Sequence, residues 1–263
     1  MLQDLLSNWI YILPAVFIAF SFHEFAHSFV AYKLGDTAQK ESGRLSLNPI
    51  NHIDPIGFIS LVLFGFGWAK PVQVNPYMFK DRKNGMIQSA VAGPLANLIL
   101  GFVFTILMQL TIKTGLFING PVGNYLYYFC VYSIVMNVGL GVFNLIPLPP
   151  LDGSKILMGI LDEETYFKIM QYERYIAIFM IAILLSGVLD GPLLYVRSAI
   201  IDFYSNIVSK NFILRKRKRL IHVASFFIYL TVKYQSVCNI RKSRHFTGKY
   251  RYSTVTDLAR FLG

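Results

Sequence analysis

The sequence predicts an all-α polytopic membrane protein, a bundle of about five to six transmembrane helices with a short re-entrant or hairpin segment after the first span. Two observations predict this class. Hydrophobic residues make up 54% of the 263-residue chain, and its mean hydropathy is +0.49. These residues are also gathered in long apolar runs, which are typical of membrane spans and not of an ordinary soluble domain.

The first apolar run covers about Trp9 to Tyr32. At 1.5 Å per residue, a helix of this length crosses a hydrocarbon core about 30 Å thick. The run lacks a basic start, so it is not expected to be a cleaved signal peptide. A polar connector follows over residues 33–55. Residues 56–76 are apolar but are broken by two glycines and a proline, which favours a re-entrant loop or a hairpin at the membrane edge.

Two further spans are expected at about residues 85–112 and 125–146, and the second of them ends in the sequence NLIPLPPLDG. After a charged stretch, weaker apolar runs cover about residues 176–189 and 193–208. Residues 1–210 are therefore predicted to form one membrane-embedded domain, with its best-defined part at residues 8–175. The two cysteines lie in an apolar run and in the tail, and no structural disulfide is expected between them.

The formal net charge of +11 lies entirely in the tail. Residues 211–263 contain 12 Lys or Arg residues and one acid, Asp257. A tail of this kind is typical of a cytoplasmic flank attracted to anionic lipid, and nucleic-acid binding is not expected as the main role. Its last residues, RYSTVTDLARFLG, resemble a peptide that recurs when a reading frame continues into a neighbouring RNA gene. Part of the tail is therefore predicted not to be native, which the intact mass of the natural protein would test.

The basic residues of the first 210 positions predict an orientation. Residues 33–85 carry seven Lys or Arg residues, whereas none precedes the first span and only Lys113 lies between the second and third spans. Cytoplasmic loops are enriched in Lys and Arg, so the connector is expected in the cytoplasm and the N-terminus outside. The ends of the first and third spans then meet on the cytoplasmic side of a cell (inner) membrane.

The motif His-Glu-x-x-His occurs inside the first span, at His23, Glu24 and His27. Residues four apart share one face of a helix, so both imidazoles can reach one zinc ion, and Glu24 can act on its water as a general base. Polar and ionisable groups at membrane depth are costly and usually functional. The spacing therefore predicts one catalytic zinc ion.

A catalytic zinc site needs a third protein ligand, and several residues are candidates. The best is Asp152, where two prolines and a glycine break the helix after the third span and free the side chain to point inward. An alternative for Asp152 is a helix N-cap, and the residues alone do not decide between the two. The other candidates are His52, Asp54, Asp190 and Asp202.

Three motifs in this order resemble the site-2 protease family of intramembrane zinc metalloproteases. They are His23-Glu24-x-x-His27, AGPLAN in the second span and NLIPLPPLDG after the third. The stretch GWAKPVQVNP is similar to the compact branch of the family, which lacks a PDZ domain. The resemblance covers about residues 8–175, becomes loose from Glu164 and is not found in the tail.

The resemblance implies an all-α protease whose third zinc ligand is Asp152, with Asn144 holding the substrate or the developing oxyanion. It assigns Gly93 and Asn97 to an element that approaches the site from the second span, although Gly93 is also explained by helix packing alone. The implied substrates are single-span membrane proteins in the bilayer. The alternatives are a polytopic metal transporter and a catalytically silent protein that only binds membrane partners. The sequence does not identify the substrate, the oligomeric state or the gating mechanism.

Overall fold

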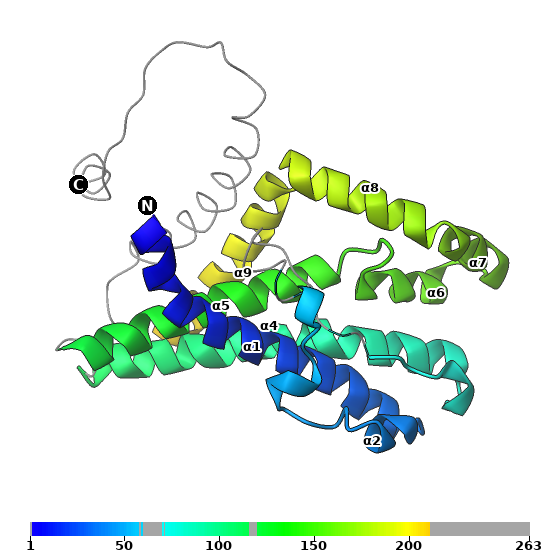
Figure 1. The fold of residues 1–263 in the computed structure, drawn as a ribbon, viewed down its shortest axis with the longest axis horizontal. Coiled ribbons are helices and arrows are strands. Elements are labelled where there is room, and N and C mark those ends of the chain that lie inside the picture. The colour runs from blue at the N-terminus through cyan, green and yellow to red at the C-terminus, as the bar shows by residue number, and fades with distance from the viewer. Residues whose placement is uncertain (1, 58, 60–69, 71, 116–119, 211–263) are drawn as a thin grey trace, which may run out of the picture.

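The computed structural model describes residues 2–57, 59, 70, 72–115 and 120–210 (Figure 1). Three long helices form its centre: α1 (Leu2–Lys33), α4 (Arg82–Lys113) and α5 (Pro121–Asn144). Each of the three packs against the other two. No residue in these described ranges lies in a β-strand, so the predicted all-α class is confirmed.

Three helices in the described part of the chain are long and apolar enough to cross a membrane, namely Asn8–Lys33, Arg82–Lys113 and Pro121–Asn144. The shortest has 24 residues, or about 36 Å of helix, which exceeds a hydrocarbon core of about 30 Å. The three expected spans are therefore confirmed. The expected total of five to six spans is not, because α8 (Glu173–Ser186) has only 14 residues and α9 (Asp190–Lys210) contains four charged residues.

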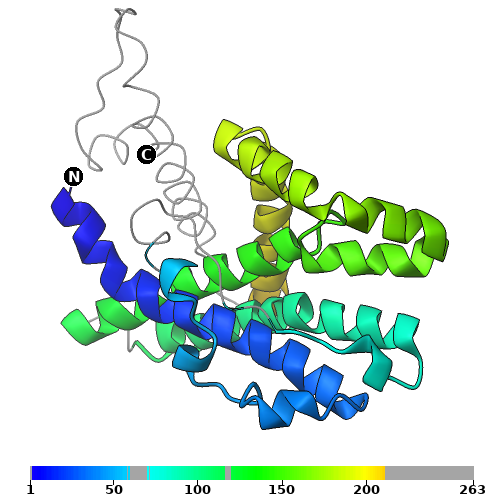
Figure 2. The ribbon, with the colours of Figure 1, turned by 45° about the vertical axis from the view of Figure 1, so that its right-hand side comes forward.

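Apart from α8 and α9, the remaining elements are short and lie mainly at one end of the bundle (Figures 1 and 2). The chain between α1 and α4 contains α2 (Ala38–Glu41) and two 3-10 turns, η1 (Pro49–Asn51) and η2 (Pro76–Met78). After α5, the chain forms η3 (Asp152–Ile156), α6 (Leu157–Ile160) and α7 (Glu163–Gln171) before α8 and α9. The middle of the predicted re-entrant or hairpin segment (residues 58, 60–69 and 71) and the whole tail at 211–263 lie outside the described residues.

The two ends of the bundle differ in chemistry. The C-terminal ends of α1 and α5 and the N-terminal end of α4 meet beside the connector, where Lys33 and Arg82 lie (Figure 1). At the opposite end the ring of Tyr11 lies 5.3 Å from that of Tyr125 and 5.4 Å from that of Tyr128. Tyrosines of this kind mark the membrane–water interface, and basic residues mark the cytoplasmic end of a span.

The apolar core lies where α4, α5 and α9 meet. Met108 of α4, Ile134 of α5 and Ile201 of α9 are buried there, and Cys130 is a buried free thiol in the same cluster. Close approach of α4 and α5 depends on small residues. A Cβ atom at Gly141 would lie 2.9 Å from the Pro94 carbonyl oxygen and 3.0 Å from Leu98 Cγ. Glycine at this position therefore lets the two helices touch through their backbones.

We expect Gly141→Val to destabilise the bundle by about 1–3 kcal/mol, because the added atoms meet backbone and cannot be accommodated without moving α4. The measurement is the free energy of unfolding in detergent. The control is Gly139→Ala, whose Cβ would lie 3.7 Å from its nearest neighbour, an ordinary contact distance. Equal stability of the two variants would contradict the backbone contact.

Candidate metal centre

Three side chains from two distant parts of the chain converge at the basic end of the bundle. The Nε2 atoms of His23 and His27 lie 3.0 Å apart, and each lies 3.1 Å from Asp152 Oδ2. Among the described residues, these three form the one group of His, Cys, Asp or Glu side chains that could hold a metal ion. His52, Asp54, Asp190 and Asp202, the other candidates for the third ligand, are not part of it.

The chain brings Asp152 back to α1 by a sharp turn after α5. The backbone N–H of Leu148 donates to Ile146 O, and that of Leu151 donates to Leu148 O. A Cβ atom at Gly153 would lie 2.5 Å from the carbonyl oxygens of both Leu145 and Ile146, so this turn closes only around glycine. Asp152 opens η3 but makes no capping hydrogen bond there, so the N-cap alternative is not the arrangement found.

The hydrogen bonds of both imidazoles fix which nitrogen carries the proton. His27 Nδ1 lies 2.7 Å from the Ser89 carbonyl oxygen, which can only accept, so Nδ1 is the donor. His23 Nδ1 lies 2.6 Å from Asn97 Oδ1. Because the Asn97 amide nitrogen donates to Ala19 O, its oxygen faces His23 and accepts as well. Neutral His23 and His27 therefore both present a lone pair at Nε2.

When both rings are neutral, two nitrogen lone pairs and a carboxylate oxygen thus face one another, an arrangement that a bound cation stabilises. A tetrahedral zinc ion with bonds of about 2.0–2.1 Å holds its ligand atoms roughly 3.3 Å apart, close to the observed spacing. Two imidazoles and one carboxylate are also the donor set of many catalytic zinc sites. The side chains present therefore fit one zinc ion.

Burial raises the pKa of the Asp152 carboxyl, but hydrogen bonds and positive charge from the facing imidazole nitrogens, when these carry protons, lower it by more than burial raises it. A cation in the same place also favours the ionised carboxylate, which is the form that a metal ligand needs. Its side chain keeps 19% of its surface exposed, against 5% and 8% for the two imidazoles, so water reaches the cluster from the Asp152 side.

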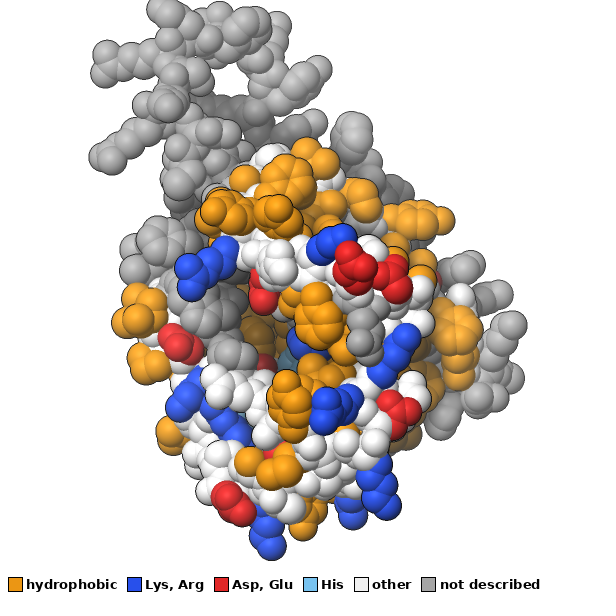
Figure 3. Space-filling model, turned by 90° about the vertical axis from the view of Figure 1, so that its right-hand side faces the viewer, with side chains coloured by type: hydrophobic (Ala, Val, Ile, Leu, Met, Phe, Trp, Pro, Cys, Tyr) orange, Lys and Arg blue, Asp and Glu red, His pale blue; other side chains and the backbone are white. Residues whose placement is uncertain are grey.

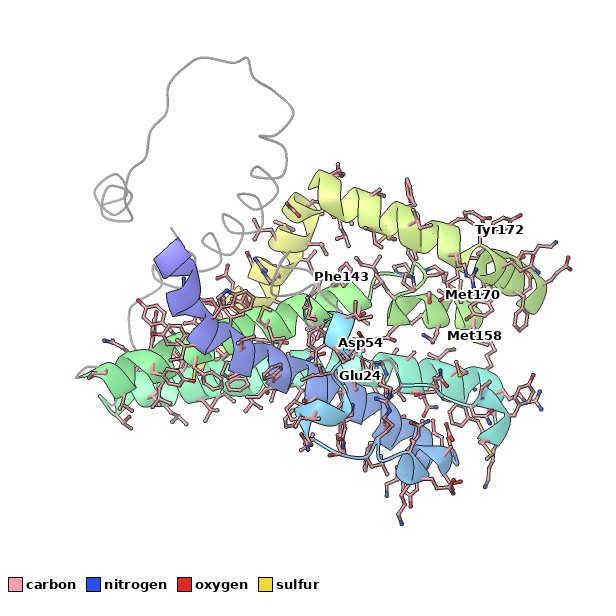
Figure 4. All side chains as sticks on the ribbon, in the orientation of Figure 1. Glu24, Asp54, Phe143, Met158, Met170 and Tyr172 are labelled. Atoms are coloured by element: carbon pink, nitrogen blue, oxygen red, sulfur yellow. The ribbon has the colours of Figure 1, made fainter. Side chains whose placement is uncertain are left out.

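Glu24 lies beside this cluster and is held by the chain between α1 and α4. Its side chain is buried, and Oε2 accepts a hydrogen bond of 3.1 Å from the backbone N–H of Val72. Glu24 Oε1 accepts no hydrogen bond from any described residue. Figure 4 shows Glu24 on α1 near the connector, with Asp54 beside it in this view.

The face of the molecule at this end is hollowed at its centre, with charged side chains of both signs around the hollow (Figure 3).

Comparison with known proteins agrees with this chemistry. The sequence model of peptidase family M50 matches residues 11–187, which include His23, Glu24, His27 and Asp152. The chain belongs to peptidase family M50. This is the site-2 protease family that the motifs predicted, and the chain is a zinc-dependent metalloendopeptidase of the membrane.

Relatives of this M50 protein carry names of the same kind. The chain is 40% identical over 170 residues to "Putative zinc metalloprotease YwhC" of Bacillus subtilis, a match that covers 65% of this chain and 78% of the relative. It is 37% identical over 149 residues to "Putative zinc metalloprotease MJ0611" of Methanocaldococcus jannaschii, covering 55% and 68%. It is 24% identical over 189 residues to "Putative zinc metalloprotease Rip2" of Mycobacterium tuberculosis, covering 70% of each. No solved structure matches the chain.

The remaining predicted residues of this M50 site differ in their surroundings. Asn97 is fully buried, and its amide nitrogen also donates to Asn137 Oδ1 at 2.9 Å, so its polar atoms bind protein groups. Asn144 is half-buried at the end of α5, where its amide donates to Leu140 O. The substrate or oxyanion roles expected of Asn97 and Asn144 stay predictions.

Gly93 lies directly against the imidazoles. A Cβ atom at this position would clash with His27 Nε2, and it would lie 2.6 Å from His27 Cε1 and 2.9 Å from His23 Cε1. The sequence alone did not decide whether Gly93 serves helix packing or the metal site, and the structure places it at the site.

Contacts that are made through backbone atoms, such as Ser89 O and the Val72 N–H, have no signal in the sequence. Asn137 did have a sequence signal, because its amide side chain lies inside an otherwise apolar span, where polar groups usually have a role.

We expect Gly93→Ala to lower zinc content strongly, because the methyl group occupies the space of the imidazoles. Zinc per purified chain, measured by elemental mass spectrometry, tests this. Gly139→Ala, on α5 and with room for a methyl group, is the matched control. Full zinc content in Gly93→Ala would contradict the close approach of α4 to the imidazoles.

Asn97→Ala should weaken zinc binding by roughly 10–100-fold, because residues that orient a ligand imidazole have effects of that size. The competing concentration of a chelator that removes half of the zinc measures the change. Thr105→Val is the control, since Thr105 is a buried polar residue of the same helix that bonds only Gly101 O. A similar loss in both variants would mean that a general weakening of α4 is responsible.

Proposed function

We propose that this M50 protein is an intramembrane endopeptidase that hydrolyses peptide bonds in or near the transmembrane segments of membrane proteins, with one catalytic zinc ion. The observation that carries the proposal is the position of the cluster. His23, Glu24 and His27 all lie within the membrane-spanning part of α1, at Asn8–Lys33. A protease site on such a helix fits substrates that are themselves in the bilayer.

His23, His27 and Asp152 are the proposed zinc ligands. When bound, the ion supplies Lewis-acid chemistry, lowering the pKa of a water and polarising the scissile carbonyl. Asn97 holds the His23 ring by accepting from Nδ1, and Ser89 O does the same for His27. Three protein ligands leave a coordination position open, as catalytic zinc sites require.

Glu24 is the proposed general base, and its two oxygens have different surroundings. Oε2 accepts from the Val72 N–H, which fixes the carboxylate, whereas Oε1, which accepts no hydrogen bond from the described residues, can take the proton of the attacking water. The same oxygen can then deliver the proton to the leaving amine. Asn144, at the end of α5, is the proposed partner of the substrate carbonyl oxygen.

The proposed location is the cell membrane, with several passes and the site toward the cytoplasm. Support comes from Lys33 and Arg82 at the end of the bundle that holds the site, and from the tyrosine cluster at the other end. From this side the exposed edge of Asp152 needs only a short polar path to bulk water. The proposed partners are the lipid bilayer and single-span membrane proteins, and no nucleic acid is expected.

Glu24→Gln should abolish cleavage of a synthetic transmembrane peptide while the protein keeps one zinc per chain, because the amide has the same shape and lacks the basic oxygen. Removing a general base costs about 10²–10⁴-fold in rate. Glu41→Gln, an exposed acid of α2, is the matched control and should cleave normally. Cleavage by Glu24→Gln at the normal rate would exclude this mechanism.

In cells, the Glu24→Gln variant should cause full-length membrane substrates to accumulate, which comparative membrane proteomics against the unsubstituted strain would identify. A zinc-binding protein that cleaves no transmembrane peptide and changes no membrane protein would instead fit a transporter or a silent partner-binding protein.

A further inference from the structure

A short extended segment, residues 72–75, lies along the end of α1 and touches the site at Val72. Three hydrogen bonds join it to side chains of α1, of the turn after α1 and of α2. The Val72 N–H donates to Glu24 Oε2 at 3.1 Å. Next along the chain, Gln39 Nε2 donates to Gln73 O at 2.8 Å, and the Asn75 N–H donates to Asp36 Oδ2 at 2.9 Å. The bond to Glu24 is thus followed along the chain by two further anchors within three residues.

The two anchors are built into the interior of the protein. Asp36 is fully buried and Gln39 is 2% exposed. They also hold each other, because Gln39 Nε2 donates to Asp36 Oδ2 at 2.8 Å. Within the described ranges no Lys, Arg or His forms an ion pair with Asp36. Keeping a carboxylate out of water with no ionic partner is costly, so its presence calls for an explanation.

The turn that carries Asp36 is fitted closely against the same segment. Gly35 has a φ of +119°, which residues with a side chain rarely adopt, and a Cβ atom there would lie 2.7 Å from Met78 O. The turn after α1 therefore contacts this part of the chain at Asn75, through Asp36, and at Met78, through Gly35. Since Glu24 is also on α1, this turn sets where Val72 lies relative to the Glu24 carboxylate.

We propose that Asp36 and Gln39 are positioning residues for Glu24, acting through the backbone of residues 72–75. By fixing Gln73 and Asn75 they place the Val72 N–H on Oε2, and this leaves Oε1 as the oxygen that faces the reacting water. The inference rests on the proposed proteolytic role of Glu24. It adds two residues that touch neither the zinc ligands nor the reacting atoms in the described structure.

The test compares Asp36→Ala, Gln39→Ala and the conservative Asp36→Asn in the full-length protein. Hydrogen–deuterium exchange of the Val72 and Asn75 amides should accelerate by roughly two- to tenfold in the two alanine variants, since each loses a hydrogen bond that holds the segment. For cleavage of a synthetic transmembrane peptide, kcat should fall by about ten- to hundredfold, because small displacements of a catalytic group have effects of this size. KM and zinc content should stay unchanged.

Asp36→Asn should recover most of kcat and of the exchange protection, because the amide oxygen still accepts from the Asn75 N–H. The control is Asp81→Ala, which removes a side chain that accepts from the Asn84 N–H at the start of α4 and does not touch residues 72–75. It should leave kcat and the exchange of Val72 and Asn75 unchanged.

Three results would overturn the proposal: faster exchange with normal kcat, unchanged exchange in both alanine variants, or zinc loss in step with kcat. If Asp36→Ala fails to fold, Gln39→Ala decides by the same measurements. Glu24→Gln is measured in parallel. Cleavage that persists without Glu24 defeats the proposed function, whereas Glu24-dependent cleavage that survives Gln39→Ala defeats only the positioning role.

Discussion

Two imidazole nitrogens and a carboxylate oxygen lie 3.0–3.1 Å apart, and much of the surrounding structure holds them there. Without a cation these lone pairs repel one another. Each imidazole must therefore be held through its other ring nitrogen. Asn97 Oδ1 accepts from His23 Nδ1, and Ser89 O accepts from His27 Nδ1. Both of these groups belong to α4, which makes α4 the support of a metal centre whose ligands lie on α1 and η3.

The residues of α4 that hold the imidazoles also have their own polar groups at membrane depth, and these groups need hydrogen-bond partners. In lipid a buried amide must find partners within the protein. Asn97 joins three helices in this way, because it accepts from His23 on α1, donates to Ala19 O on α1 and donates to Asn137 on α5. Asn137 in turn donates to Ser133 O. The network satisfies its own members and also orients a metal ligand.

The extent to which this site could be predicted depends on whether local spacing or distant packing decides each contact. His23 and His27 follow from helical periodicity alone, since residues four apart share a face. Asp152 could be ranked first but not chosen from the residues, because its partnership spans 125 positions and depends on a turn that only Gly153 permits. The contact of Val72 with Glu24 uses a backbone N–H, which every residue but proline has, so no sequence pattern marks it. The expected total of five to six spans is not confirmed, since the short apolar run of α8 makes a helix of only 14 residues, too short to cross a membrane.

Glycine at positions 93 and 153 shows why the metal centre and the helix bundle cannot be separated. At each position a single added carbon would meet an imidazole or a carbonyl oxygen at 2.6 Å or less. The ligands are therefore placed by the distance between backbones, and not by adjustable side chains that could follow a shifted helix. A change in how α4 packs on α1 must then alter the geometry of the ligands directly. Conversely, an ion that ties α1 to η3 favours the packed state over any state in which these segments are apart, so metal binding and assembly of the bundle stabilise each other.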